Sequence, residues 1–435
     1  IVIELNFIFH REVTVNRQYG QAASILQGLM DVLHQFEKHK HIQHISQLAN
    51  QVESLRSRLA QQILDDFHST FEGPLAKNAF SQNILQLLSE GCLVISILDP
   101  KVKRELLSWF VDLELSEYKT LFQENQDVAW LDKIDKRFTW LKKHLMEFED
   151  KFGRMFPPSW EVSEYIAVEF CKITRRDLAK VMTNRAHELN VNLLLPAIGK
   201  AANFEKILSQ RFTGITIKEL NSEVSTASEK QMKLHPFGGQ ITHCFENYLY
   251  IYVEAQDKNL SKLIDQFVEE HQKLAKTDCV VSEIFISSGK LFTQYKNCLT
   301  QCISLSNRQP LVSLTTTFQK HLREYAHRVL QANLPRIGGA MSSLASISSS
   351  ITSAANTPGG MLSAATSAAG LLQNLLKEGE SNRFTKSELC QICCILLTAN
   401  YCLETTQQLE KKLQEKIDSS LIDKINMNAE QDLFH

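Results

Sequence analysis

The sequence predicts an all-α fold built of stacked helical bundles. Its 435 residues include only 16 glycines and 9 prolines, where average usage would give about 50 of the two together. Folds made of many short strands need these residues at their tight turns, so a β-sandwich, barrel or propeller is disfavoured. Apolar side chains also recur at steps of three and four residues over long stretches, as they do on the buried face of a helix.

Residues 18–72 are predicted to form a helical, coiled-coil segment, and residues 1–17 are left unassigned. A short heptad stripe within this segment comprises Ile45, Leu48, Val52, Leu55 and Leu59. Such a stripe is buried either inside its own chain or against a partner helix, and over 42–67 the two alternatives are equally favoured. Gly73 and Pro74 end the segment.

Residues 75–218 are predicted to form a helical bundle, and the start of one of its helices can be identified from the sequence. At Asp99-Pro100, the carboxylate can accept an unpaired backbone N–H, and proline at the first helical position has no N–H to leave unpaired. A later stretch, Thr174 to Asp177, resembles a capping sequence ahead of a further helix.

The same bundle contains the most regular apolar seam of the chain. It comprises Leu131, Ile134, Phe138, Leu141, Leu145, Phe148 and Phe152. This spacing predicts a helix of about 25 residues that buries one stripe. Gly153 and the prolines at 157 and 158 end that helix.

A linker is predicted over residues 219–240, followed by a second helical bundle over 241–335. The run from Tyr248 to Val253 is rich in β-branched and aromatic residues and would favour a strand when taken alone. Because the apolar residues that follow return to helical spacing, we predict a helix here.

The carboxy-terminal part divides into a low-complexity tract and a further helix. Residues 336–382 are predicted to be a flexible insertion, since serine and alanine make up more than half of 340–370 and large apolar side chains are few. A third helical bundle is expected to begin within 383–435. Its first helix starts at Thr385, because Thr385 and Glu388 have the spacing of a capping box.

Charge and cysteine usage predict a cytosolic, soluble chain. The net charge is −2 and no run of four to eight Lys/Arg is present, which argues against nucleic-acid binding and against docking on anionic lipid. Ten cysteines are too few for a disulfide scaffold and several lie within apolar runs, as free thiols do. No apolar stretch of about 18 residues and no signal peptide is evident. The missing initiator methionine indicates a fragment, a processed form or an incomplete gene model.

Two clusters of cysteines have the residue types of a metal site. Cys390, Cys393 and Cys394 include one C-x-x-C pair, but a structural zinc site needs four ligands. Cys298 and Cys302 lie one helical turn apart. Core packing is the favoured interpretation of both clusters. Around the first cluster, Leu389, Ile392, Leu396 and Leu403 have helical spacing and are expected to pack in the same core.

A histidine cluster gives the other candidate metal site. It comprises His34, His39, His41 and His44, with Glu37 one turn before His41. At most three of these side chains share an open helix surface, and no second element closes the ligand shell. A solvated helix end is therefore the favoured interpretation.

No catalytic, cofactor-binding or metal-binding residue is predicted, and the chain is not expected to be an enzyme. The sequence has no phosphate-binding loop, no G-x-S-x-G and no H-E-x-x-H. Asp127, Asp132 and Asp135 lie close in sequence, but around the apolar seam they are expected to face outward beside Lys133 and Lys136. Surface ion pairs of this kind contribute a few tenths of a kcal/mol each.

Eight segments in chain order resemble the vacuolar protein sorting-associated protein fifty-three family. They are Arg17 to Leu33, Cys92 to Lys103, Phe122 to Asp135, Ile166 to Met182, Asn203 to Gly214, Tyr248 to Val268, Leu314 to Leu330 and Asn400 to Asp418. The most specific of them is Phe122 to Asp135, FQENQDVAWLDKID, which is too long for a chance match. The resemblance spans about 18–430.

The resemblance implies an elongated helical rod, acting as a non-catalytic subunit of the Golgi-associated retrograde protein complex and the endosome-associated recycling complex. Such subunits capture endosome-derived carriers at the trans-Golgi network and promote SNARE-dependent fusion. The implied partners are other vacuolar-protein-sorting tethering subunits, with SNAREs and small GTPases as further candidates. Membrane contact would be peripheral and indirect, on the cytoplasmic face of trans-Golgi network and endosomes. No cofactor, nucleic acid or small-molecule substrate is implied. The alternative function is a helical adaptor or regulator of a small GTPase.

Three departures from the family pattern affect these expectations. Residues 1–17 do not resemble the family, and the amino-terminal coiled coil through which its members assemble is not found upstream. The family also continues past residue 435. Finally, Pro196 stands where an apolar residue is expected and should kink or break its helix.

Overall fold

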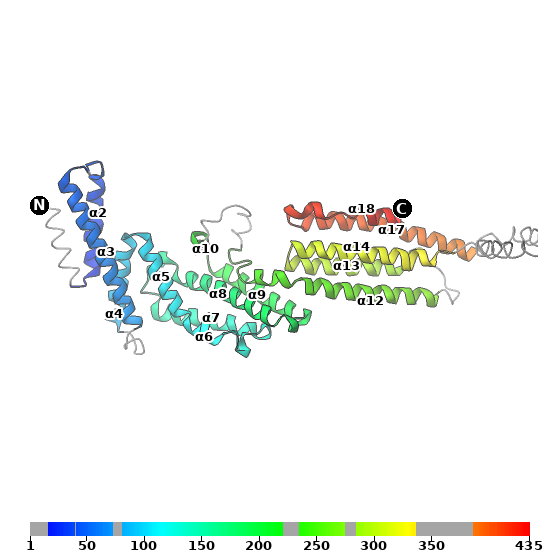
Figure 1. Ribbon diagram of the computed structural model, residues 1–435, viewed down its shortest axis with the longest axis horizontal. Helices are drawn as coiled ribbons and strands as arrows, with labels where there is room; N and C mark the ends of the chain where they lie inside the picture. The colour runs from blue at the N-terminus through cyan, green and yellow to red at the C-terminus, as the bar shows by residue number, and fades with distance from the viewer. Residues whose placement is uncertain (1–15, 40, 73–80, 221–234, 275–283, 336–385) are drawn as a thin grey trace, which may run out of the picture. The chain divides into compact units, whose positions relative to one another are not determined.

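A computed structural model describes residues 16–39, 41–72, 81–220, 235–274, 284–335 and 386–435. Every regular element in these ranges is helical and none of these residues lies in a strand, so the fold is all-α as predicted (Figure 1). The chain divides into two compact units, Ile1–Phe245 and Glu246–His435. The predicted flexible tract over 336–382 and Thr385 of the predicted capping box lie outside the described residues, and helix α17 begins at Lys386.

The described part of the first unit begins with helices that pack around α4. These helices are α2 (Tyr19–Gln35), α3 (Gln43–Phe71), α4 (Gln82–Ile97) and α5 (Pro100–Glu114). Helix α4 packs against α2, α3 and α5. The heptad stripe of α3 is buried from Val52 onward and half-buried at Ile45 and Leu48. This stripe therefore packs for most of its length inside the unit.

The predicted start of α5 is confirmed. Pro100 is the first helical residue, and Asp99 Oδ1 accepts a hydrogen bond from the Lys101 N–H at 2.8 Å. This bond satisfies one of the four N–H groups that have no partner within a helix.

The second part of this unit is built around the predicted seam. Its helices are α6 (Ser116–Leu121), α7 (Ile134–Phe152), α8 (Val162–Asn184), α9 (Val191–Arg211) and α10 (Ile215–Leu220). All seven seam residues are buried, and α7 ends before Gly153 as predicted. The helix is shorter than expected, because Leu131–Lys133 form a separate 3₁₀ turn. Rings of α3, α5 and α7 meet in one core, where Phe110 lies 5.2 Å from Phe71 and 6.3 Å from Phe152 between centroids.

One prediction in this unit is wrong, and a second is wrong in part. Thr174 does not cap a helix but lies in the middle of α8, where its hydroxyl is 2.6 Å from the hydroxyl of Tyr118. Pro196 does not break α9, which runs through it. Its ring removes only the N–H that would bond the carbonyl of Asn192, and both residues are on the exposed side of the helix, where water can take that bond.

Two buried carboxylates hold the chain on either side of residues 221–234. Glu164 of α8 accepts hydrogen bonds from the N–H groups of Gly214 and Thr216, at 3.1 and 2.8 Å. Glu205 of α9 accepts from the backbone N–H and the hydroxyl of Thr242, at 2.8 and 3.0 Å. Burial raises the pKa of Glu205, and the backbone donors act against that rise. Of the predicted linker over 219–240, residues 221–234 lie outside the described ranges.

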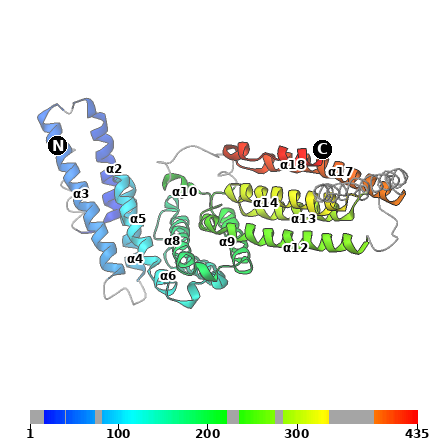
Figure 2. The same cartoon turned by 45° about the vertical axis from the view of Figure 1, so that its right-hand side comes forward.

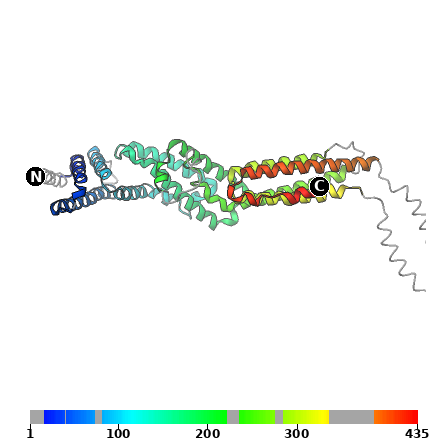
Figure 3. The same ribbon diagram turned by 90° about the horizontal axis from the view of Figure 1, so that it is seen from above.

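In its described residues, the second unit contains four long helices. Its elements are α12 (Tyr250–Leu274), α13 (Ile286–Leu305), α14 (Gln309–Tyr325), the π-helical turn η8 (Ala326–Leu330), α17 (Lys386–Lys416), the 3₁₀ helix η10 (Ser419–Lys424) and α18 (Asn428–Phe434). Helices α12, α13 and α14 lie side by side (Figure 2). Helix α17 lies on α13, and α18 turns back beside α17 and α14 (Figure 3). The stretch from Tyr250 is helical, as predicted against its strand propensity.

Buried polar contacts join the helices of this unit. The Tyr252 hydroxyl of α12 donates to the Cys298 carbonyl of α13 at 2.9 Å, and Tyr295 stacks on Phe318 of α14 at 4.3 Å between ring centroids. His321 of α14 is fully buried, with Nε2 2.7 Å from Asp257 Oδ1 of α12. These contacts fix the register of three neighbouring helices.

The stability of the protein is expected to fall as the pH falls below about 6.5, in part because of His271. Burial lowers the pKa of this side chain, Glu270 partly offsets that effect, and Nε2 lies 3.2 Å from Ser287 Oγ. The unfolded chain therefore binds more protons than the folded chain in this pH range, which favours unfolding. The thermal midpoint should drop between pH 7.5 and pH 5.5 by more in the wild type than in His271→Gln. Parallel pH profiles of the two proteins would contradict this assignment.

Candidate functional site

The predicted clusters of metal-ligating residue types do not come together as ligand shells. In the described ranges, no group of three or more His, Cys, Asp or Glu side chains is placed to hold a metal ion. His34 lies 3.3 Å from Glu37, His41 and His44 are exposed, and the side chain of His39 is outside the described part. Cys298, Cys302 and Cys394 are buried, as predicted. Cys390 and Cys393 are exposed, so for these two residues the prediction of core packing is wrong.

The predicted acidic cluster faces outward. Asp127, Asp132 and Asp135 are all exposed. Asp135 forms its ion pair with Lys200 of α9, rather than with the lysines next to it in sequence. This pair is exposed at both ends and contributes little to stability.

The most specific sequence segment, 122–135, folds around a buried arginine. Arg137 of α7 is fully buried, and its guanidinium donates to the Tyr118 hydroxyl at 2.8 Å and to the carbonyls of Phe122 and Ala129 at 3.4 and 3.3 Å. No carboxylate of the described residues pairs with it. Burial raises the pKa of Tyr118, which keeps the phenol neutral, and the arginine acts against that rise. Sequence reasoning missed Arg137, because charged residues are seldom fully buried.

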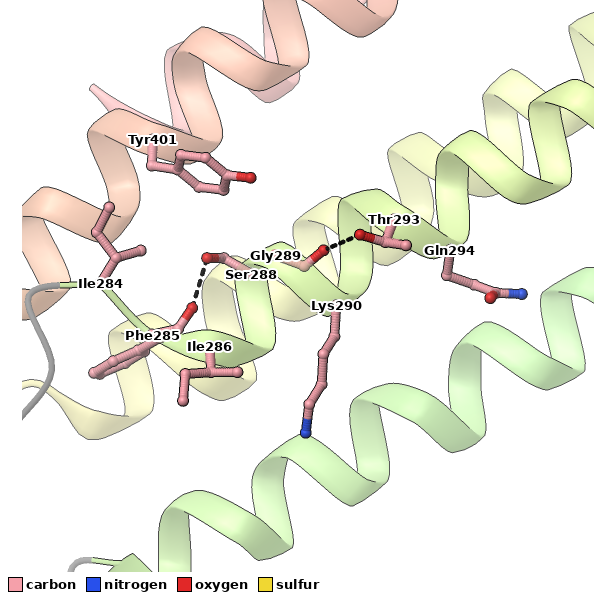
Figure 4. Close-up of a pocket in the computed structure, with 9 residues that line it drawn as sticks. All are labelled: Ile284, Phe285, Ile286, Ser288, Gly289, Lys290, Thr293, Gln294 and Tyr401. Atoms are coloured by element: carbon pink, nitrogen blue, oxygen red, sulfur yellow. Dashed lines mark hydrogen bonds between the residues drawn. The ribbon is translucent and has the colours of Figure 1, made fainter.

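A shallow, open groove lies between α13 and α17. It consists of two hollows that share Gly289, Thr293 and Tyr401, and we call it the α13–α17 groove. Figure 4 shows the end of the groove where α13 begins, with Tyr401 of α17 above Ser288 and Gly289. The floor of the other end is apolar, with buried Phe292 and Leu299.

Two hydrogen bonds set the parallel register of these two helices. The Phe285 N–H donates to Thr398 Oγ1 at 3.0 Å beside the start of α13. The Asp418 N–H donates to the Asn307 carbonyl at 2.9 Å just beyond its end. The groove is therefore bounded by two helices whose spacing is fixed at both ends.

The charged side chains of the groove are all lysines. Lys296 of α13 and Lys412 of α17 lie at the end of the groove nearer the C-termini of the two helices, and neither has an ion pair among the described residues. Lys290 points away toward α12, where it lies 3.5 Å from Glu270 (Figure 4). Helix α13 contains no Asp or Glu. The lining residues at one end of the groove thus carry only positive charge.

The first half of α17 exposes apolar side chains that the sequence assigned to the core. Leu389 is 49% exposed and Leu396 is 61% exposed, so for these two leucines the prediction is wrong. The buried face is formed by Cys394, Ile395 and Thr398 instead. Because apolar side chains lie on almost every side of this half of α17, their spacing does not indicate which face of the helix packs against a neighbour.

Helix α17 also corrects the expectation that no apolar stretch reaches membrane-spanning length. It contains an 18-residue window of mean hydropathy 1.2, of which 28% is buried, and by length and composition it could cross a membrane. Core helices pass the same test, so a single helix of this kind is weak evidence.

Comparison with known proteins gives a consistent set of matches. The family model described as Vps53, N-terminal, matches residues 7–272. Vacuolar protein sorting-associated protein 53 A of Arabidopsis thaliana is 27% identical over 462 aligned residues, which cover 96% of this chain and 51% of the relative. The homolog of protein 53 in Caenorhabditis elegans is also 27% identical, with 96% and 47% covered.

A third relative, vacuolar protein sorting-associated protein 53 of Saccharomyces cerevisiae, is 24% identical over 68% of this chain and 34% of its own length. The chain spans about half the length of the Arabidopsis and Caenorhabditis relatives. No solved structure matches it.

Proposed function

The chain belongs to the Vps53 family, and we propose on that premise that it is a non-catalytic subunit of a vesicle-tethering complex. The observation that carries the proposal is the family match over 7–272, together with relatives named for vacuolar protein sorting. The all-α units support it, because a subunit of this kind needs long helical surfaces for assembly and no reaction centre.

In its finer form, the proposal assigns the chain to endosome-to-Golgi retrograde transport and endocytic recycling. Its complexes would be the Golgi-associated retrograde protein complex and the endosome-associated recycling complex. There it would act on the cytoplasmic face of the trans-Golgi network and endosomes and promote SNARE-dependent fusion of carriers. The subunits beside it would be other vacuolar-protein-sorting proteins, and its membrane contact peripheral.

Isolation of the chain from cells tests this proposal. The 435-residue chain with a carboxy-terminal affinity tag is expressed in cultured cells and purified under native conditions, and its partners are quantified by mass spectrometry. We expect three other subunits of a sorting complex to be enriched over a tag-only control. Enrichment of a small GTPase without those subunits would favour the adaptor function instead.

A further inference from the structure

We propose that the α13–α17 groove binds an amphipathic helix of another protein, apolar along one face and acidic toward one end. The proposal stands on the chemistry of the groove itself and does not depend on the tethering function. Grooves between packed helices commonly accept a partner helix through apolar residues at positions i, i+3 or i+4, and i+7.

The length of the groove sets the length of its occupant. Along α13, the lining residues run from Ile286 to Leu299, which at 1.5 Å per residue is about 20 Å. A helix of about four turns, or 14 residues, fills that length. Because both walls are continuous helices held by hydrogen bonds at each end, the groove is already formed in the free chain.

The surface of the groove is shaped for close approach by an apolar helix. Gly289 lies between Ile286 and Phe292 on α13, and a Cβ placed on it would meet no atom within 4 Å. The open space above this glycine admits a side chain of the partner. At the mouth of the groove Ile286 is 71% exposed, and Ile284, which also lines it, is exposed as well. Exposed large apolar side chains gathered in this way are typical of binding surfaces.

The charge of the groove indicates the charge of its occupant. Lys296 and Lys412 lie together at one end, and the lining residues include no Asp or Glu. An acidic end on the bound helix would complement them, which favours both orientation and rate of association. The other end of the groove is apolar, so the acidic residues of the partner are expected in one half of its helix.

Two other occupants fit less well. A second copy of this groove would supply no acid to meet Lys296 and Lys412. A flat anionic membrane would contact the lysines but would not reach the floor at Phe292 and Leu299, which are buried between the two helices. A convex, acidic helix satisfies both the floor and the lysines.

Two pairs of designed 14-residue peptides test the proposal against the whole chain. All four carry the same leucine face. The acidic peptide has four glutamates in its carboxy-terminal half in one pair and in its amino-terminal half in the other, and each twin has lysines at those positions. Binding is measured by fluorescence anisotropy at low ionic strength. We expect the acidic peptide, in at least one of its two orientations, to bind at least tenfold more tightly than its twin, and added salt to weaken it.

Variants of the chain locate the binding. Lys296→Glu combined with Lys412→Glu should reverse the preference between the two peptides. Gly289→Leu should reduce affinity for the acidic peptide at least tenfold by filling the floor. Gly199→Leu is the matched control, since Gly199 lies inside α9 with equally open space and its variant should bind as the wild type does. Thermal melts of all variants verify that they are folded.

Each of the remaining outcomes would overturn the proposal. Binding of neither peptide, equal binding of both, or an unchanged preference in the double lysine variant would remove the charge argument. Binding only after deletion of residues 340–376 would make a segment of the chain itself the occupant. If the chain forms a dimer and Gly289→Leu dissociates that dimer, the occupant of the groove would be a second copy of the chain. The occupant would be a membrane if the wild type sediments with phosphatidylserine vesicles, the double lysine variant does not, and neither peptide binds.

Discussion

Replacing Leu141 by glutamate is expected to unfold the first unit, with a loss of more than about 4 kcal/mol in the free energy of unfolding. Leu141 is fully buried at the centre of the α7 seam. The change deletes a packed side chain and buries a carboxylate among the apolar residues of the seam. Leu145→Glu, one turn later, should have an effect of the same size. Urea unfolding followed by circular dichroism measures both.

Met146 supplies the matched control for these variants. It lies on the same helix but is 68% exposed, so Met146→Glu should change stability by less than about 0.5 kcal/mol. If Leu141→Glu and Met146→Glu melt at the same temperature, α7 does not bury the seam.

Arg137→Met is expected to cost about 3 to 5 kcal/mol, the second large effect. The methionine keeps most of the buried volume but removes the donors to Tyr118, Phe122 and Ala129. Replacing both members of a buried ion pair can be neutral, but the partners here are backbone carbonyls and a phenol that stay in place. Thermal and urea unfolding give the loss.

The control for that variant is Arg185→Met. Arg185 lies over the ring of Trp130 at 3.9 Å and pairs with Glu188 on the surface, where the loss of stability should be much smaller than for Arg137→Met. Equal stability of Arg137→Met and the wild type would show that the 122–129 segment does not depend on the arginine.

The features predicted correctly from sequence are those decided by near neighbours in the chain. The seam from Leu131 to Phe152 and the start of α5 at Asp99 depend on spacing within one helix. Thr174 was misassigned because its side chain bonds Tyr118, which is 56 residues away in sequence, rather than an N–H of its own helix. Local motifs do not contain that information.

The candidate site lay largely beyond sequence reasoning for the same reason. The walls of the α13–α17 groove come from residues more than 100 positions apart, such as Phe285 and Thr398. Two signals were present in the sequence: a glycine inside the helical stretch at 289, and lysines without any acid from 286 to 305. Neither signal indicates a groove until α17 is known to lie beside α13. The proposed function depends on family membership, since no pattern of spacing or composition indicates tethering.

The carboxylates of Glu164 and Glu205 have an evolutionary consequence. Each fixes one end of the connection between α10 and the 3₁₀ helix Thr242–Tyr248 through hydrogen bonds to backbone N–H groups. Because these hydrogen bonds come from backbone N–H groups, they do not depend on which side chains stand at positions 214, 216 and 242. A reporter domain inserted between residues 221 and 234 is accordingly expected to leave the helices on either side in place.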